Sequence, residues 1–288
     1  MFRHFLITRF NLRTAEWETT KHNERVLDDA WYENRFDLFE KFCLPSVVQQ
    51  TNQNFSWIIL FDTQTPDRYK TRIDELVMGH SNFMVLFIDG MKEMGNAFSN
   101  IVRSTIDPAT DFVVSTRLDN DDMIHRDFIK IIQQLVSHAP EKERLIIDLR
   151  SGLQLNLESH PCEVRKIKAS FNPFISVAAP AGDDESVVTR THSQWSTEKN
   201  VIVYDTRPLW VEIVHSKNKV NAVKTKIKKG YGFDEAAFGV GTKLSMENYF
   251  RIFISNTKLF WQQFFTMLKG LLITAASKLK SKYKSTVV

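Results

Sequence analysis

The sequence has 288 residues, of which 43% are hydrophobic and 25% charged, so it can bury the core of an ordinary globular protein. Its two cysteines are too few for a disulfide framework, and neither lies in a Cys/His pattern typical of zinc. The net charge of +4 hides a segregation: residues 216–288 carry fourteen Lys/Arg and three Asp/Glu, whereas residues 1–215 carry 24 and 31. This acidic body argues against a nucleic-acid-binding protein.

Apolar runs typical of buried strands recur along the first half of the chain. The first, at residues 4–8, lies in an amino-terminal stretch too short and too often interrupted by charge for a signal peptide, which favours a strand. Further strands are predicted at residues 57–62, 83–89, 111–119 and 144–150. Most of these are continuous apolar runs, as in a parallel sheet that is covered on both faces.

Helical patterns lie between the predicted strands. Apolar residues recur at helical spacing over residues 36–47, where Pro45 predicts a kink. Thr65 and Pro66 predict the cap and first turn of another helix. Two more helices are expected over residues 94–106 and 125–140. The alternation predicts an α/β fold whose ligands gather beyond the carboxyl ends of the strands.

The alternation weakens beyond residue 151. Residues 170–186 have the composition of a loop. Two further strands are predicted at residues 200–205 and 208–215, and the second ends in His215.

Three carboxylates, Asp119, Asp121 and Asp122, crowd together at the end of a predicted strand. Two carboxylates about 4 Å apart repel by roughly 1 kcal/mol in water, and by more where they are partly buried. Such a cluster is tolerated when water solvates it, when arginines neutralise it, or when a divalent cation binds it. A plain charged turn is one alternative, since Asp and Asn are common turn residues.

A calcium loop of the EF-hand type is excluded, because Met123, Ile124 and Lys130 stand where it requires an oxygen ligand, a Gly and a Glu. Asp119 and Asp121 project to the same side of an extended chain. They suit Mg²⁺ or Mn²⁺, with coordination sites left open for diphosphate oxygens.

The segment STRLDNDDMI resembles the DxD motif of GT-A glycosyltransferases, which use nucleotide-sugar donors. The segment RFDLFEKFCLPSVVQQTNQNFSWIILFDTQTPD is similar to the family-2 pattern of a helix, a Ser-x-x-x-Gln-Thr turn and a strand ending in Asp. FLITRFN, GNAFSNIVRST and RPLWVEIVHSKN extend the likeness in the same order. The closest resemblance is to the bacterial proteins described as putative rhamnosyltransferases, and it covers roughly residues 1–225.

The resemblance implies a GT-A fold, with a mostly parallel central sheet flanked by helices and a carboxyl-terminal helical extension. It implies one catalytic domain over residues 1–225, with the nucleotide-sugar-binding half at 1–125 and the acceptor-side half at 126–225. Residues 226–288 are expected to form a basic amphipathic extension.

The implied activity is that of a metal-dependent glycosyltransferase in polysaccharide biosynthesis. It would move a sugar, rhamnose by the name of the group, from a nucleotide-sugar to a glycan or lipid-linked acceptor with inversion, using Mn²⁺ or Mg²⁺. A nucleotide-sugar nucleotidyltransferase is an alternative, although TRFNLRTAEW contains no Gly for a triphosphate loop. The other alternative is a non-catalytic glycan- or membrane-binding protein on a GT-A fold.

The resemblance also assigns roles to individual residues. Contacts with the nucleotide-sugar are expected from Thr8, Arg9, Asn11, Asp62, Arg103, Arg117 and Asp119. The expected metal ligands are Asp119, Asp121 and His215, with Asp122 orienting either carboxylate. Candidates for the general base are Asp184, Glu185, His192 and Glu198, none of which matches the family-2 Glu-Asp pair well.

The basic carboxyl-terminal segment combines aromatic residues and leucines with spaced lysines. Its apolar stretch from Leu259 to Ala276 is interrupted by Gln262, Gln263 and Lys269, which makes a transmembrane span improbable. The pattern predicts a helix lying on anionic lipid at the cytoplasmic face of the membrane, as suits a lipid-linked acceptor. A helix packed on the catalytic domain is the alternative.

Overall fold

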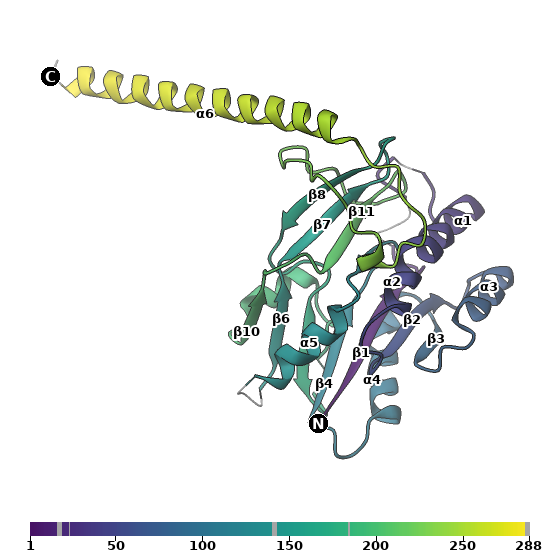
Figure 1. Ribbon diagram of the computed structural model, residues 1–288. Helices are drawn as coiled ribbons and strands as arrows, with labels where there is room; N and C mark the ends of the chain where they lie inside the picture. Colours follow the sequence, from purple (N-terminus) through teal and green to yellow (C-terminus); the bar gives the residue numbers. More distant parts are fainter. Residues whose placement is uncertain (16–18, 23, 140–142, 184, 286–288) are drawn as a thin grey trace.

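The computed structural model describes residues 1–15, 19–22, 24–139, 143–183 and 185–285. A seven-stranded sheet with helices on both faces forms the main body, and a four-stranded sheet packs beside it (Figure 1). A long helix extends from this body at the carboxyl-terminal end. The fold class expected from the sequence is confirmed.

The large sheet has the strand order β3-β2-β1-β4-β9-β6-β10. Its strands are β1 (Phe2–Arg9), β2 (Ser56–Asp62), β3 (Phe83–Ile88), β4 (Phe112–Arg117), β6 (Leu145–Leu149), β9 (Ser176–Pro180) and β10 (Val201–Tyr204). Six of them run in one direction, and β9 is antiparallel to both β4 and β6. The sequence assigned a loop to the region of β9, so that expectation is wrong; its small residues gave no strand signal.

Helices from different parts of the chain cover the two faces of this sheet. They are α1 (Asp29–Leu38), the π-helical turn Phe39–Cys43, α2 (Leu44–Val48), α3 (Asp67–Val77), α4 (Met94–Thr105) and α5 (Phe128–Ser137). Side chains of α1, α3 and α5 pack with alternate residues of the strands on one face. On the other face, α4 and the 3₁₀ turn His192–Thr197 pack against the remaining strand residues.

Two expected helix signals are resolved by the structure. Pro45 lies in the first turn of α2, directly after the π-helical turn, so the helix restarts at this proline. Helix α3 begins at Asp67, and Pro66 holds its cap position without a side-chain hydrogen bond. The predicted cap by Thr65 is therefore wrong, because its hydroxyl donates to the carbonyl of Asp62 instead, at 2.6 Å.

The smaller sheet has the order β5-β11-β7-β8. Its strands are β5 (Met123–Ile124), β7 (Ser151–Asn156), β8 (Glu163–Lys168) and β11 (Trp210–Val214). The Trp210 ring packs directly on Gly152 of β7. Any larger residue would clash with it, since a Cβ there would lie 2.2 Å from the ring. The sheet joins the segment that follows β4 to β11, the strand that directly precedes His215.

We predict that His4 makes the protein less stable in acid. Its Nε2 lies 2.8 Å from Thr116 Oγ1, and burial lowers its pKa from 6.5 to about 3. The unfolded chain therefore binds a proton that the folded chain excludes. The free energy of unfolding should fall as the pH drops below 6.5, by up to about 1.4 kcal/mol per pH unit. Urea unfolding of wild type and His4→Gln, from neutral pH to about pH 4, should show a shallower fall in the variant; equal slopes would contradict this.

Candidate active site

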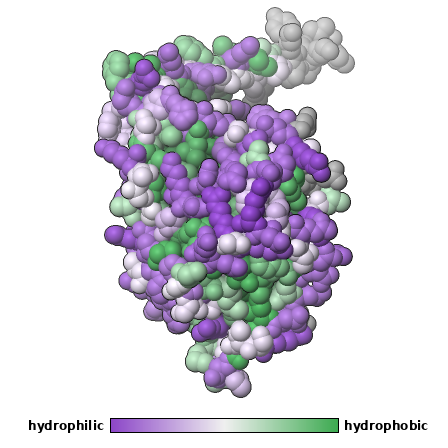
Figure 2. Space-filling model, turned by 90° about the vertical axis from the view of Figure 1, so that its right-hand side faces the viewer, coloured by the Kyte–Doolittle hydropathy of each residue, from purple (hydrophilic) through white to green (hydrophobic). Residues whose placement is uncertain are grey.

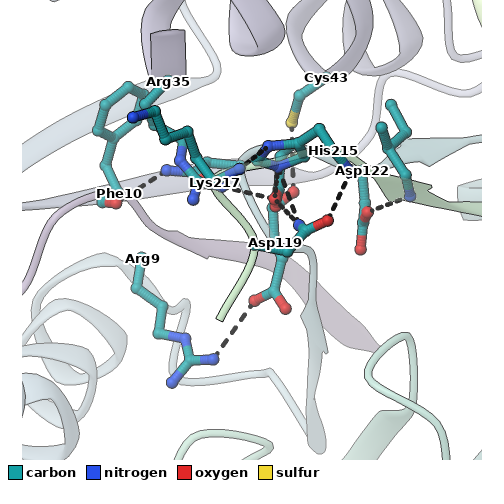
Figure 3. Close-up of polar contacts among 12 residues, drawn as sticks. Arg9, Phe10, Arg35, Cys43, Asp119, Asp122, His215 and Lys217 are labelled. Carbon is teal, nitrogen blue, oxygen red and sulfur yellow. Dashed lines mark hydrogen bonds and ion pairs between the residues drawn. The ribbon is translucent and has the colours of Figure 1, made fainter. Parts of the chain in front are cut away.

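The side chains of interest meet where parallel strands of the large sheet end. The DxD segment follows β4, Arg9 ends the adjacent strand β1, and Asp62 ends β2. His215 reaches the same place from the end of β11 in the smaller sheet. Figure 3 shows Asp119 facing Arg9, with Arg35, His215 and Asp122 gathered nearby. The carboxyl edge of a parallel sheet is the usual place for ligands in such folds.

Asp119 is bound by two arginines. Arg117 Nη2 lies 3.1 Å from its Oδ1, and Arg9 Nη2 lies 3.5 Å from the same oxygen. Burial alone would raise the pKa of this carboxyl group, but the two guanidinium groups outweigh burial and lower the pKa of Asp119. The structure thus brings together three of the residues expected to contact a nucleotide-sugar.

Asp121 is buried and accepts contacts from three groups at its Oδ2. Arg35 Nη1 lies 2.5 Å away, His215 Nε2 2.9 Å and Asn218 Nδ2 3.1 Å. Burial would raise the pKa of Asp121, but Arg35 and His215 lower it. The carboxylate of Asp121 is therefore paired with groups inside the protein and is not solvated by water.

Asp122 has a different role from its two neighbours. Its Oδ1 accepts the backbone N–H of Ile213 in β11 at 2.9 Å, which ties the DxD segment to the smaller sheet. Burial, and then the charges of Asp121 and Asp119, raise the pKa of Asp122 well above its usual range. The structure thus gives Asp122 an architectural contact, and its expected orienting role stays a prediction.

Arg35 is the main residue of the site that sequence reasoning missed. It comes from α1, and its Nη1 also donates to Asn120 Oδ1 at 3.0 Å, while Asn120 Nδ2 donates to the carbonyl of Phe10 at 2.8 Å. The Arg35 guanidinium lies 5.1 Å from the centre of the Trp31 ring. Its Nε is buried and has no hydrogen-bond partner among the described residues. Nothing in the local pattern around position 35 distinguishes it from a surface arginine, since its partners lie far away in sequence.

Asp62 is linked to a neighbouring strand end by another arginine. Arg13 Nε donates to Asp62 Oδ1 at 2.7 Å, and Arg13 Nη2 lies 2.5 Å from Asp89 Oδ1. The side chain of Asp62 is 2% exposed. Because its oxygens are already engaged within the protein, its expected contact with a base or ribose stays a prediction.

Two other expected nucleotide contacts are turned into the protein. Thr8 Oγ1 accepts the indole N–H of Trp57 at 2.9 Å and lies in the core. Asn11 Nδ2 donates to Tyr32 Oη and to Thr65 Oγ1, both at 2.8 Å. Both residues brace the strand ends, and this placement does not favour direct contact with a ligand.

Arg103 lies away from the DxD segment. It is an exposed residue near the end of α4, the helix that returns the chain to the amino end of β4. Asp119 follows the opposite end of that strand. The structure therefore does not bring Arg103 together with the other expected residues.

The four candidates for the general base belong to a segment that follows β9. Because β9 is antiparallel to β4, this segment starts beside the amino end of β4, where the Ala181 N–H donates to the carbonyl of Asp111 at 2.8 Å. Glu185 and Glu198 both form ion pairs with Arg144 and Arg190.

Of the remaining two candidates, only His192 is among the described residues. His192 Nδ1 faces the carbonyl of Phe171. Asp184 lies outside the described residues. The ion pairs of Glu185 and Glu198 hold this segment on the sheet, and the role of any of the four as a base stays a prediction.

The expected metal ligands are only partly brought together. Asp121 Oδ2 and His215 Nε2 lie 2.9 Å apart, close to the separation of adjacent ligands on an ion bound at about 2.1 Å. Asp119 faces arginines instead, and within the described ranges no three His, Cys, Asp or Glu side chains are placed to hold one ion. The carboxylate suits Mg²⁺ or Mn²⁺, whereas an imidazole is more usual on zinc or iron and so favours Mn²⁺ over Mg²⁺ here. Arg35 now provides the positive charge beside Asp121. Asp121 and His215 could bind such an ion only if the Arg35 side chain moved away from this carboxylate.

Comparison with known protein families gives one match for this chain. The model of the family described as "Putative rhamnosyl transferase" matches residues 3–227. No curated protein matches the chain.

Several solved structures are distantly similar. Staphylococcus aureus TarS 1–349 has a TM-score of 0.45 and 10% identity over 73% of this chain and 60% of that one. Its complex with UDP covers 74% and 60%, with the same TM-score of 0.45 and identity of 10%. A putative nucleotide-diphospho-sugar transferase from Desulfovibrio desulfuricans G20 has a TM-score of 0.39 and 8% identity, with 75% and 82% covered. The chain thus spans 60% of the length of the TarS structures.

We predict that Arg35→Gln lowers the stability of the protein. The change removes the cation beside the buried Asp121, and breaking one side of a buried pair costs roughly 3–5 kcal/mol. For a chain of this size we expect Tm to fall by about 10 °C, measured by thermal unfolding. Arg117→Gln is the matched control, because Asp119 keeps Arg9 and is 28% exposed. Equal losses in the two variants would contradict the structural importance of the Arg35 contact.

Proposed function

The chain belongs to the family described as putative rhamnosyl transferases, and on this premise we propose that it is a glycosyltransferase that moves a sugar from a nucleotide-sugar to a glycan acceptor. The match over residues 3–227 carries this proposal. The position of the DxD carboxylates at the carboxyl edge of a parallel sheet supports it. Rhamnose as the sugar rests on the description of the family.

The charges at the site suit a nucleoside diphosphate. Arg9 and Arg117 both lie against Asp119, so two guanidinium groups face one carboxylate there. Arg35 adds a third guanidinium beside Asp121. Arginine side chains bind phosphate oxygens through charge-assisted and bidentate hydrogen bonds. We therefore expect Arg9 and Arg117 to bind and orient the diphosphate of the donor.

A divalent cation, Mn²⁺ or Mg²⁺, is part of this proposal. Asp121 and His215 would hold it, with Asp119 beside them. When bound, such an ion supplies positive charge that stabilises the diphosphate as it leaves the sugar.

Inversion at the sugar and the identity of the base are further parts of the proposal. An acceptor hydroxyl that attacks opposite the diphosphate needs a proton acceptor within hydrogen-bond reach. Asp119 and Asp121 are poor bases, because the surrounding cations lower the pKa of each. The base is therefore expected on the acceptor side, among residues 126–225.

The acceptor is proposed to be a lipid-linked glycan of a polysaccharide pathway at the cytoplasmic face of a membrane. The support for it is the long carboxyl-terminal helix α6 (Tyr249–Ser285), which contains no Asp or Glu and exposes a series of aromatic side chains.

Release of nucleoside diphosphate from a panel of nucleotide-sugars with Mn²⁺ tests the activity. We expect turnover of at least one donor, and a loss of about 100-fold or more in Asp119→Asn and Asp121→Asn, a size typical of losing transition-state electrostatics. Asp67→Asn is the control, since Asp67 is an exposed residue of α3. Undiminished turnover in both variants would refute the assignment of the site. Pyrophosphate release from a nucleoside triphosphate and a sugar 1-phosphate would instead indicate a nucleotidyltransferase.

The cation can be tested without turnover, by its effect on Tm. We expect Mn²⁺ to raise the Tm of Arg35→Gln more than that of the wild type, because the ion replaces the positive charge lost from Asp121 and has no guanidinium to displace. Arg117→Gln again serves as the control for a general change in charge. The same Mn²⁺ shift in all three proteins would argue against Asp121 as a metal ligand.

A further inference from the structure

Helix α6 is anchored to the body near its beginning. Ile252 is buried, and Asn256 exchanges two hydrogen bonds with the backbone of Lys229, at 2.8 and 2.9 Å. Gln263 Nε2 donates to the carbonyl of Lys226 at 2.8 Å. These three helix residues are spaced by four and seven positions, so they share one face, which contacts the body. Figure 1 shows the remainder of α6 extending well beyond the two sheets.

A different face of α6 is apolar and exposed. Trp261, Phe265 and Leu272 are 49%, 60% and 64% exposed. The face consists of Trp261, Phe264, Phe265, Leu268, Leu271 and Leu272, at helical spacing. By this spacing it points away from the face that contacts the body. The helix at the top of Figure 2 shows such hydrophobic side chains interleaved with hydrophilic ones. Contiguous apolar surface of this extent marks an interaction site.

The charge of α6 is entirely positive. The helix contains seven Lys/Arg and no Asp/Glu. Arg251, Lys258 and Lys269 are exposed and spaced by seven and eleven positions, so they form one line along a border of the apolar face. The other four lysines follow at positions 278, 280, 282 and 284 of the sequence. A partner that covers this face must therefore offer apolar groups to the apolar side chains and negative charge to the basic residues along their border.

We propose that α6 docks on an anionic lipid surface, with its apolar face among the acyl chains and its cationic border at the headgroups. A helix with one aromatic, leucine-rich face and lysines on the other lies in the plane of the membrane interface. Among the described residues, no helix is both long and apolar enough to cross a bilayer, which agrees with surface docking. A second copy of the helix is disfavoured as the covering surface, because it would set like charges beside one another.

Sedimentation of the full-length protein with vesicles tests the proposal. We expect binding to phosphatidylcholine vesicles that contain phosphatidylglycerol, and weaker binding to pure phosphatidylcholine or at raised salt. Trp261→Glu combined with Leu268→Glu places two charges in the apolar face. This variant should bind at least about tenfold more weakly than the wild type.

A matched control separates insertion from simple attraction of charge. Thr266→Glu combined with Ser277→Glu adds the same two charges on the side of the helix away from the apolar face, and should retain most of the binding. Equal losses in both double variants would overturn insertion of the apolar face, and no binding by the wild type would overturn docking altogether. A stable dimer that the Trp261/Leu268 variant dissociates would show that a second copy covers the face. None of these measurements depends on turnover, so failure of the proposed reaction would leave their outcome unaffected.

Discussion

One buried ion pair, between Arg35 and Asp121, joins parts of the chain that are remote in sequence. Arg35 lies in α1, Asp121 follows β4, and His215 and Asn218 reach the same carboxylate from beyond β11. A buried carboxylate is costly unless it is paired, and so these segments must assemble together. In this structure arginines neutralise two of the three acids after β4, Asp119 and Asp121, whereas Asp122 has a raised pKa and accepts a backbone N–H. The same arrangement leaves guanidinium groups at the edge of the sheet where a phosphate ligand would be expected.

The main sheet could be predicted from the sequence because its strands are covered on both faces. Such strands are largely apolar runs: β2 and β3 are nearly continuous, and β1 and β4 each contain a shorter apolar run. Strands β7 and β8 could not be predicted, because they mix polar and apolar residues and bury Gln154 and Arg165 through tertiary contacts. Strand β9 gave no signal because it consists largely of small residues. In each of these cases the partners that fix the strand are distant in sequence.

The candidate site was predictable to the extent that its residues are adjacent in the chain. The DxD carboxylates and Arg117 could be recognised together, and the family resemblance also pointed to His215. Sequence alone could not show which way Thr8 faces, and its hydroxyl meets Trp57 in the core. Arg35 and Asn218 could not be recognised either, since each acquires its role through a contact across the fold. Strand patterns locate the edge of a sheet well, but tertiary packing decides which side chains reach it.

The bond from Asp122 to the Ile213 backbone has a consequence for how this motif would respond to systematic mutagenesis. Alanine at Asp119 would remove the carboxylate between Arg9 and Arg117, and alanine at Asp121 would leave the buried Arg35 without its acidic partner. Alanine at Asp122 would remove one hydrogen bond between this segment and β11. If all three variants lost activity, each would therefore have lost it for a different structural reason. Inactivity by itself is therefore poor evidence of ligation in this loop, and structural assays must accompany any kinetic scan of it.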